Sequence, residues 1–206
     1  MVKAMSEKIQ IKPFVSDLVT LEMETVAPFE RQIEDEDVKR FPMACHFLLD
    51  ARRVLNDHVS ELRVHLEEIG GESSTGFKSA VSGVVGSAVS MLQPNRKTQV
   101  SRYLRDDHAA LSTLCLSYEM LHASALATHN YSTASLALRH LEELAAVSME
   151  CSRVIPSVVV QELVEVDASL DGSVIDEAGH NIHKAWKYGA KLEYQKEHHK
   201  QFAASI

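Results

Sequence analysis

The chain has 206 residues, of which 45% are hydrophobic and 24% charged, which is enough for one well-covered core or for one domain with a tail. Its formal net charge is −8 and its basic residues are scattered, which argues against a nucleic-acid-binding surface. No apolar run approaches the roughly 20 residues that cross a bilayer, and residues 1–11 lack the pattern of a signal peptide. We therefore expect a cytoplasmic protein with neither a nucleic-acid nor a membrane partner.

Cysteine, glycine and proline usage narrows the fold class. Cys45, Cys115 and Cys151 have no paired short spacing, which indicates neither a disulfide framework nor a structural zinc site. Glycines and prolines number only 8 and 5, and long stretches lack the alternation that is typical of strands. The sequence therefore predicts an all-α protein.

The first predicted helix covers about 14–34, after a short N-terminal segment over 1–12. One apolar stripe runs along it, formed by Val15, Leu18, Phe29 and Ile33. Glu22 falls on the same stripe, where a carboxylate is costly to bury without a partner. Glu22 is thus a candidate ligand.

The second predicted helix covers 42–69, framed by Pro42 in its first turn and by Gly70-Gly71 beyond its end. An inward seam at alternating steps of four and three includes His58 and His65. Glu61 lies at the edge of this inward face. Either these groups ligate a metal, or the histidines are hydrogen-bonded core residues and Glu61 is exposed.

The connection over 70–100 is long, a Gly/Ser loop followed by small and apolar residues that suit a short helix. The next connection, around Asn130, is only a few residues. Four long helices with a long crossover between the second and third have the connectivity of a ferritin-like bundle.

The third predicted helix covers 101–128 and carries Glu119 and His122 three residues apart. Two side chains at this spacing share one helical face and can meet a single metal ion. A Glu-x-x-His step is a unit of the carboxylate sites in ferritin-like bundles, although it also arises as an ordinary surface pair.

The fourth predicted helix covers 133–155, with an N-cap at Ser132 or Thr133 and an end before Pro156. Its inward candidates include His140 and Glu143, which stand in the reverse order to the Glu-x-x-His step. The apolar run 158–166 is expected to be a terminal turn of helix across the end of the bundle, so that the bundle domain covers 13–166.

Residues 167–206 are expected to form a loop and an extra C-terminal amphipathic helix over about 177–200. Its single tryptophan, Trp186, indicates that this helix docks on another surface. Its histidines are expected to be solvated rather than to bind metal.

Several short motifs, in this order and spacing, resemble the YciE/YciF-type bacterial ferritin-like stress proteins. They are Tyr118-Glu119, Leu141-Glu142-Glu143, Ser16-Asp17 followed by Glu22, and more loosely Leu55-Asn56-Asp57-His58. The resemblance covers roughly 13–156. It implies a four-helix bundle with a dinuclear non-haem iron or manganese site, a homodimer and a role in stress response. Carboxylates that bridge two such ions, with imidazoles beside them, would leave open positions for oxygen or peroxide.

By position, the resemblance carries Glu22, Asp57, Glu119 and Glu143 over as metal ligands. The sequence also departs from the pattern of the group. Leu116-Ser117 replaces an acidic-His pair before Tyr-Glu, and Ala146 stands where the histidine of a second Glu-x-x-His would be. The chain instead has histidines at inward positions of its predicted helices.

Two functional hypotheses follow, with a small-organic-ligand site as a third. The first is a dimetal protein that holds iron or manganese with a set of carboxylates and imidazoles converging at one level: Glu22, Asp57, His58, Glu61, Glu119, His122 and Glu143. The second is a metal-free helical bundle that acts as the interaction module of a homodimer, in which the glutamates pair with the histidines.

Overall fold

The structure is a computed structural model that describes residues 11–71 and 100–203, with side chains up to residue 191. All the regular elements in these ranges are helices, which confirms the predicted all-α class. They are α1 (Lys12–Glu34), α2 (Glu36–Lys39), α3 (Pro42–Glu68), α4 (Val100–Ala127), α5 (Tyr131–Val166), the 3-10 helix η1 (Gly172–Val174) and α6 (Ile175–Ala203).

The ends of α1 and α3 follow from local chemistry. Each helix begins with a proline in its first turn, where the missing N–H costs nothing. Asp35 ends α1 in an extended conformation, and its Oδ1 accepts the Asp37 N–H at 2.8 Å to start α2. Gly70, with a φ of 76°, ends α3 in the left-handed region that glycine tolerates.

The turn between α4 and α5 is short, as predicted, but its cap is not the predicted one. Asn130 accepts the Thr133 N–H at 3.2 Å, and therefore caps α5 in place of Ser132 or Thr133. Thr133 is buried instead, where its hydroxyl lies 2.7 Å from His65 Nε2.

The prediction that the fourth helix ends before Pro156 is wrong, because α5 continues to Val166. Pro156 lacks the N–H of one helical hydrogen bond, yet buried side chains on both sides, Val154 and Val158, keep the segment helical. The apolar run 158–166 is therefore part of α5 and not a separate turn.

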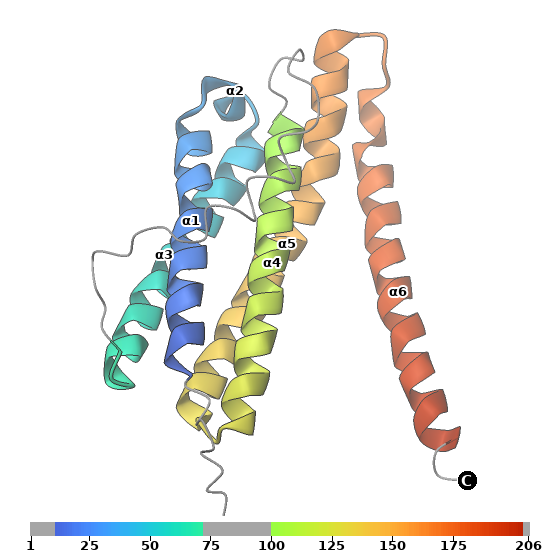
Figure 1. Cartoon of the computed structure of the whole chain (residues 1–206). Helices are drawn as coiled ribbons and strands as arrows, with labels where there is room; N and C mark the ends of the chain where they lie inside the picture. Colours follow the sequence, from blue (N-terminus) through green and yellow to red (C-terminus); the bar gives the residue numbers. More distant parts are fainter. Residues whose placement is uncertain (1–10, 72–99, 204–206) are drawn as a thin grey trace, which may run out of the picture. The chain divides into compact units, whose positions relative to one another are not determined.

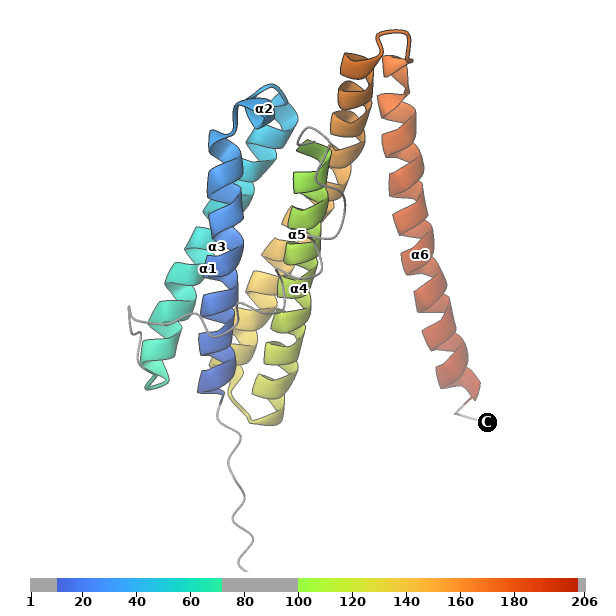
Figure 2. The ribbon, with the colours of Figure 1, turned by 45° about the horizontal axis from the view of Figure 1, so that its top comes forward.

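Four long helices pack as a bundle in the first of the two compact units into which the chain divides, residues 1–152. Figures 1 and 2 show α1 and α5 running in one direction and α3 and α4 in the other. Helix α1 packs on α3 and α4, and side chains of α5 bond to α3 and α4. Each adjacent pair is thus antiparallel, whereas α3 and α4 run parallel and are not joined as a tight hairpin.

The predicted crossover falls mainly on 72–99, outside the described residues. The second compact unit, 153–206, contains the end of α5, η1 and α6. Asp171 accepts the Ser173 N–H at 2.8 Å, which starts η1 just before α6 begins. None of the described helices is long and apolar enough to cross a membrane.

Leucine is the most frequent residue in the core of the bundle, followed by valine and alanine, and the rings of Phe29 and Phe47 pack there at a centroid distance of 6.2 Å. Midway along the bundle, this apolar filling gives way to a layer of buried polar side chains. Because polar groups are costly to bury unless they bond to one another, this layer is the first place to look for function.

Candidate metal centre

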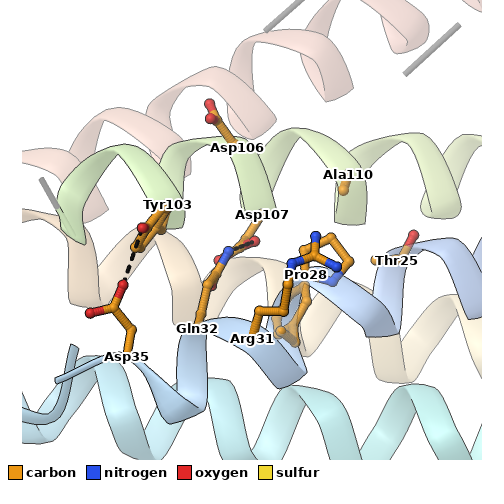
Figure 3. Close-up of a pocket in the computed structure, with 10 residues that line it drawn as sticks. Thr25, Pro28, Arg31, Gln32, Asp35, Tyr103, Asp106, Asp107 and Ala110 are labelled. Carbon is orange, nitrogen blue, oxygen red and sulfur yellow. Dashed lines mark hydrogen bonds between the residues drawn. The ribbon is translucent and has the colours of Figure 1, made fainter. Parts of the chain in front are cut away.

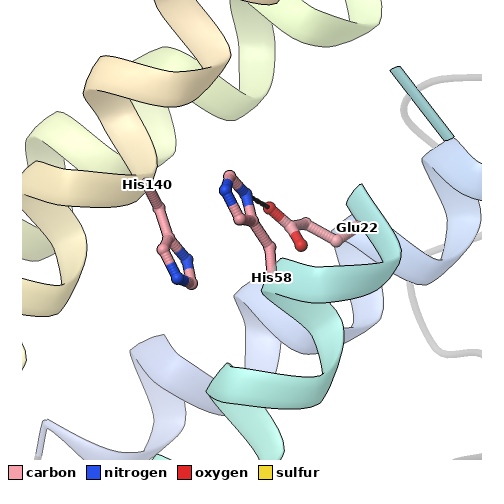
Figure 4. A group of neighbouring side chains, drawn as sticks. All are labelled: Glu22, His58 and His140. Carbon is pink, nitrogen blue, oxygen red and sulfur yellow. Dashed lines mark hydrogen bonds and ion pairs between the residues drawn. The ribbon is translucent and has the colours of Figure 1, made fainter. Parts of the chain in front are cut away.

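Each of the four long helices contributes one fully buried polar side chain to the same level of the bundle. Glu22 comes from α1, His58 from α3, Tyr118 from α4 and His140 from α5, and none is more than 1% exposed. Ligand atoms of Glu22, His58 and His140 lie within 4.8 Å of one another (Figure 4). We call Glu22, His58, Tyr118 and His140 the central cluster.

Glu22 is the common acceptor of this cluster. Its Oε1 accepts the Tyr118 hydroxyl at 2.7 Å and lies 3.1 Å from His58 Nδ1. Its other oxygen, Oε2, is buried and has no hydrogen-bond partner among the described residues. A carboxylate oxygen left in this state lacks a proton donor or a cation.

The two histidines belong to two equivalent steps, His58 with Glu61 on α3 and His140 with Glu143 on α5. Each histidine reaches across to the glutamate of the other step. His58 Nε2 lies 3.0 Å from Glu143 Oε2, and His140 Nε2 lies 3.2 Å from Glu61 Oε2.

The other ring nitrogens complete the symmetry. The Nδ1 atom of His58 faces Glu22 of its own hairpin, and the Nδ1 atom of His140 lies 3.0 Å from the Tyr118 hydroxyl of its own hairpin. The imidazole rings stack face to face, with centroids 3.8 Å apart and planes 3° from parallel. The hairpins α1–α3 and α4–α5 are thus related by an approximate twofold arrangement, in which Tyr118 takes the place of Glu22.

Arg139, Glu61 and Glu143 form a partly exposed rim over the central cluster. Arg139 makes an ion pair with Glu61 and lies 3.9 Å from Glu143 Oε1. The three side chains are 43–48% exposed, so this rim is accessible to water. A hollow of about 330 Å³ between α3 and α5 is lined by Glu61, His65 and Leu136, among others. Small ions can therefore reach the rim from the side of α3 and α5.

Burial and mutual contact set the protonation of the histidines. Burial lowers the pKa of His58, but hydrogen bonds to Glu22 and Glu143 outweigh it, so the net pKa is raised. Burial and the positive charge of His58 lower the pKa of His140 to about 4, despite Glu61. His140 is therefore neutral at neutral pH, whereas the carboxylates at both ring nitrogens of His58 favour its imidazolium form.

The pKa values of the acids and the phenol also depend on whether the group lies in the core or at the rim. Burial raises the pKa of Glu22, against its bonds to His58 and Tyr118, and burial raises the pKa of Tyr118 as well. The hydrogen bond from Arg139 lowers the pKa of Glu61 to about 2.

These protonation states leave the network one proton short. His58 donates from Nδ1 and Nε2, Tyr118 donates to Glu22, and a neutral His140 has a single N–H to share between Tyr118 and Glu61. One of the two contacts of His140 then joins two acceptors. A cation or an extra proton in the cluster removes this conflict and can also satisfy Glu22 Oε2.

The structure brings Glu22, His58, Glu61 and Glu143 of the predicted ligand set together, but not Asp57, Glu119 or His122. Asp57 is exposed and pairs with Arg53 at 3.4 Å. Glu119 is exposed as well. His122 Nδ1 donates to the backbone carbonyl of Ala134 at 2.8 Å, away from the cluster.

Helical register explains why Asp57 and Glu119 lie outside the cluster. Successive residues of a helix point about 100° apart, so Glu119 cannot face inward where Tyr118 does, nor Asp57 where His58 does. Sequence reasoning named His140 as an inward residue but not as a ligand, and it did not place Tyr118 or Arg139 in the site. The signal that could have found His140 is the recurrence of His-x-x-Glu at 58–61 and 140–143.

The spacings of the cluster fit metal ligation as well as hydrogen bonding. Two cis ligands, each about 2.1 Å from a metal ion, lie about 3.0 Å apart. The separations of His58 from Glu22 and Glu143 are 3.1 and 3.0 Å. An ion held by both atoms would lie off the line that joins them, so its binding requires the His58 ring to turn.

Comparisons of the chain with protein-family models, with curated proteins and with solved structures find no match. The central cluster and its rim therefore carry the functional argument by their own chemistry.

Proposed function

We propose that the protein is a metal-binding helical bundle of the ferritin-like type, which holds iron or manganese at the central cluster. The observation that carries the proposal is the fully buried Glu22, His58 and His140 group, together with the unpartnered Glu22 Oε2. Like charges in a low-dielectric core repel one another unless protons or cations compensate them. A divalent ion compensates Glu22 and the rim carboxylates together.

The stacked histidines favour two ions over one. The lone pair of an imidazole nitrogen lies in the plane of the ring, so an ion bound by one of two parallel rings lies outside the plane of the other. His58 and His140 therefore cannot ligate the same ion unless their stack opens. Their 3.8 Å spacing matches the separation of about 3.5–4 Å between the ions of dinuclear sites.

In this proposal both ions lie between α3 and α5, at the Nε2 edges of the two rings. His58 and Glu143 hold the first and His140 and Glu61 the second, while Glu22 at Nδ1 of His58 orients that ring. Oxygen and imidazole donors without thiolate suit iron and manganese. The described cysteines lie elsewhere, and the buried Cys151 thiol donates to the Leu104 carbonyl at 3.2 Å. Two iron or manganese ions held in this way would supply one-electron chemistry toward oxygen or peroxide, in line with a role in stress response.

The helix directions support the ferritin-like assignment and its resemblance to the YciE/YciF-type proteins. Helices α3 and α4 run parallel and each is antiparallel to its hairpin partner, which are the helix directions of ferritin-like connectivity. The homodimer that the resemblance implies remains a proposal. On α6, Trp186 and Ile182 are 63% and 38% exposed, and they offer apolar surface to a second copy. Deleting residues beyond Asp176 is expected to change the mass measured by analytical ultracentrifugation.

A second candidate function is a metal-free interaction module. It is favoured by one observation: every ring nitrogen of His58 and His140 has a polar neighbour at hydrogen-bond distance. In that case the extra proton resides on Glu22 or His140, and the network specifies the helix pairing rather than a reaction.

Calorimetric titration of untagged, metal-depleted protein with Mn²⁺ separates the two candidates. We expect the wild type to bind Mn²⁺ and to release protons, because His58 gives up a proton to the solvent on ligation. Glu22→Gln should lose binding, whereas the matched variant Glu30→Gln, on the exposed side of α1, should bind like the wild type. Absence of binding by the wild type would favour the metal-free module.

A further inference from the structure

A second buried polar group lies between α1 and α4, apart from the central cluster. Gln32 of α1 donates from Nε2 to Asp107 Oδ1 of α4 at 2.9 Å. The two side chains are 8% and 3% exposed. They line a hollow of about 430 Å³, shown in Figure 3, which falls in the usual size range of small-molecule sites.

The pair leaves two buried acceptor atoms without a donor. The amide nitrogen of Gln32 donates to Asp107, so its amide oxygen, Oε1, accepts no hydrogen bond from the carboxylate. Gln32 Oε1 and Asp107 Oδ2 are both buried without a hydrogen-bond partner among the described residues. An occupant that satisfies both must carry at least two N–H or O–H donors.

The charges around the hollow favour a cationic occupant. Asp35 and Asp106 line it together with Asp107, against the single guanidinium of Arg31. Asp35 accepts the Tyr103 hydroxyl at 3.2 Å, and Asp106 pairs with Arg105 at 2.8 Å. Within the described ranges, no ion pair joins Arg31 to Asp107, so the buried acid has no cation of its own.

The remaining wall of the hollow is largely apolar. Pro28, Phe29 and Ala110 line it, with the methyl-bearing side chain of Thr25 beside them. An apolar wall next to a polar end suits a ligand with a short hydrocarbon part and one strong donor group.

We propose that this hollow binds a small organic cation with a primary ammonium group on a short alkyl chain. The ammonium donates to Asp107 Oδ2 and Gln32 Oε1, and the alkyl chain lies along Pro28 and Ala110. Because an ammonium has three donors and a positive charge, it satisfies both acceptors and neutralises the carboxylate in one contact.

Binding is coupled to proton release. Burial raises the pKa of Asp107 to about 7, against the hydrogen bond from Gln32 and with the help of the Asp106 charge. The other ionisable groups around it are Asp35, Arg31 and Tyr103 at the hollow and Cys151 of α5, whose thiol stays protonated because burial raises its pKa to about 12. The ammonium needs the ionised acid, so affinity rises with pH until Asp107 is fully ionised.

Calorimetry on the full chain with n-butylamine as the probe tests this proposal. Near pH 8 we expect saturable binding of one molecule per chain, weakened about tenfold near pH 6 because the ionised fraction of Asp107 falls by that factor. Neutral 1-butanol, which has the same length, should not bind.

Variants separate the site from nonspecific attraction to an acidic protein. Asp107→Asn should weaken butylamine binding at least tenfold, and Gln32→Leu should also weaken it. Asp50→Asn, at an exposed position of α3 where the acid pairs with His46, should bind like the wild type. Thermal melts show which variants are folded. If Asp107→Asn is not folded, the binding measured with Gln32→Leu tests the site.

Two results would overturn the proposal. The first is no saturable binding of butylamine by the wild type near pH 8, in which case the hydrogen bond from Gln32 to Asp107 only joins α1 to α4. The second is equal binding by the wild type and both hollow variants.

Discussion

Replacing Tyr118 by phenylalanine removes a single oxygen from the centre of the bundle. The Tyr118 hydroxyl donates to Glu22 Oε1 at 2.7 Å and lies 3.0 Å from His140 Nδ1, with no exposure to solvent. The phenyl ring keeps the packing, so the change isolates the polar interaction. Glu22, whose Oε2 is already unpartnered, then keeps only His58.

The size of the effect follows from the charge and burial of Glu22. A hydrogen bond to a charged group contributes about 1.5–3 kcal/mol, and a buried acceptor that loses its partner costs an amount of similar size. We therefore expect Tyr118→Phe to lower the free energy of unfolding by about 2–3 kcal/mol. The pKa of Glu22 should also rise further, because the hydrogen bond from Tyr118 opposes its protonation.

Equilibrium unfolding in urea, followed by circular dichroism with a chelator present, measures this change. With a slope of about 2 kcal/mol per molar urea, the midpoint should fall by about 1 M or slightly more. The control is Tyr131→Phe, since this ring is 65% exposed and its hydroxyl bonds only to the exposed His129. That variant should stay within about 0.5 kcal/mol of the wild type. Equal stability of the two variants would refute the buried network.

Three further predictions concern protonation. Since the pKa of Asp107 is raised from 3.8 to about 7, its contribution to stability is complete below the lower value and lost as pH rises through about 7. Asp107→Asn should therefore flatten the fall in melting temperature between about pH 5 and pH 8, and an unchanged slope would show that another group is responsible. A pH titration of metal-free protein followed by nitrogen NMR should find that His58 keeps both ring nitrogens protonated to a higher pH than His140, because their pKa values move in opposite directions; identical titration of the two rings would contradict this assignment. Arg139→Ala should return the pKa of Glu61 from about 2 toward its ordinary range and strengthen Mn²⁺ binding, because a competing cation is removed; weaker binding in calorimetry would show that Arg139 positions the rim instead.

The helices could be predicted closely because their signals are local. Prolines in the first turns of α1 and α3, and glycine after α3, fix boundaries that need no tertiary information. The prediction that the helix ends before Pro156 was wrong because tertiary packing overrode a local signal. A proline is a strong local stop signal, but packing of the residues around it maintained α5 to Val166.

The site was only partly predictable, because a position on an inward stripe does not fix which neighbour faces the axis. Glu22 and His58 were recognisable as charged or titratable residues among apolar ones. Tyr118 was not, since a tyrosine on an apolar face is an ordinary core residue until its hydroxyl partner is known. Glu119 attracted attention through its spacing to His122, although a difference of about 100° in direction places it in solvent.

The metal content of untagged protein, purified without chelator and measured by mass spectrometry of the elements, tests the central proposal most directly. The arrangement of two hairpins around stacked His58 and His140 predicts two ions of iron or manganese for each chain, after reconstitution if not on isolation. One ion per chain would require the histidine stack to open. A protein that binds neither metal, with a melting temperature that does not respond to Mn²⁺, would contradict the proposal and leave the metal-free network.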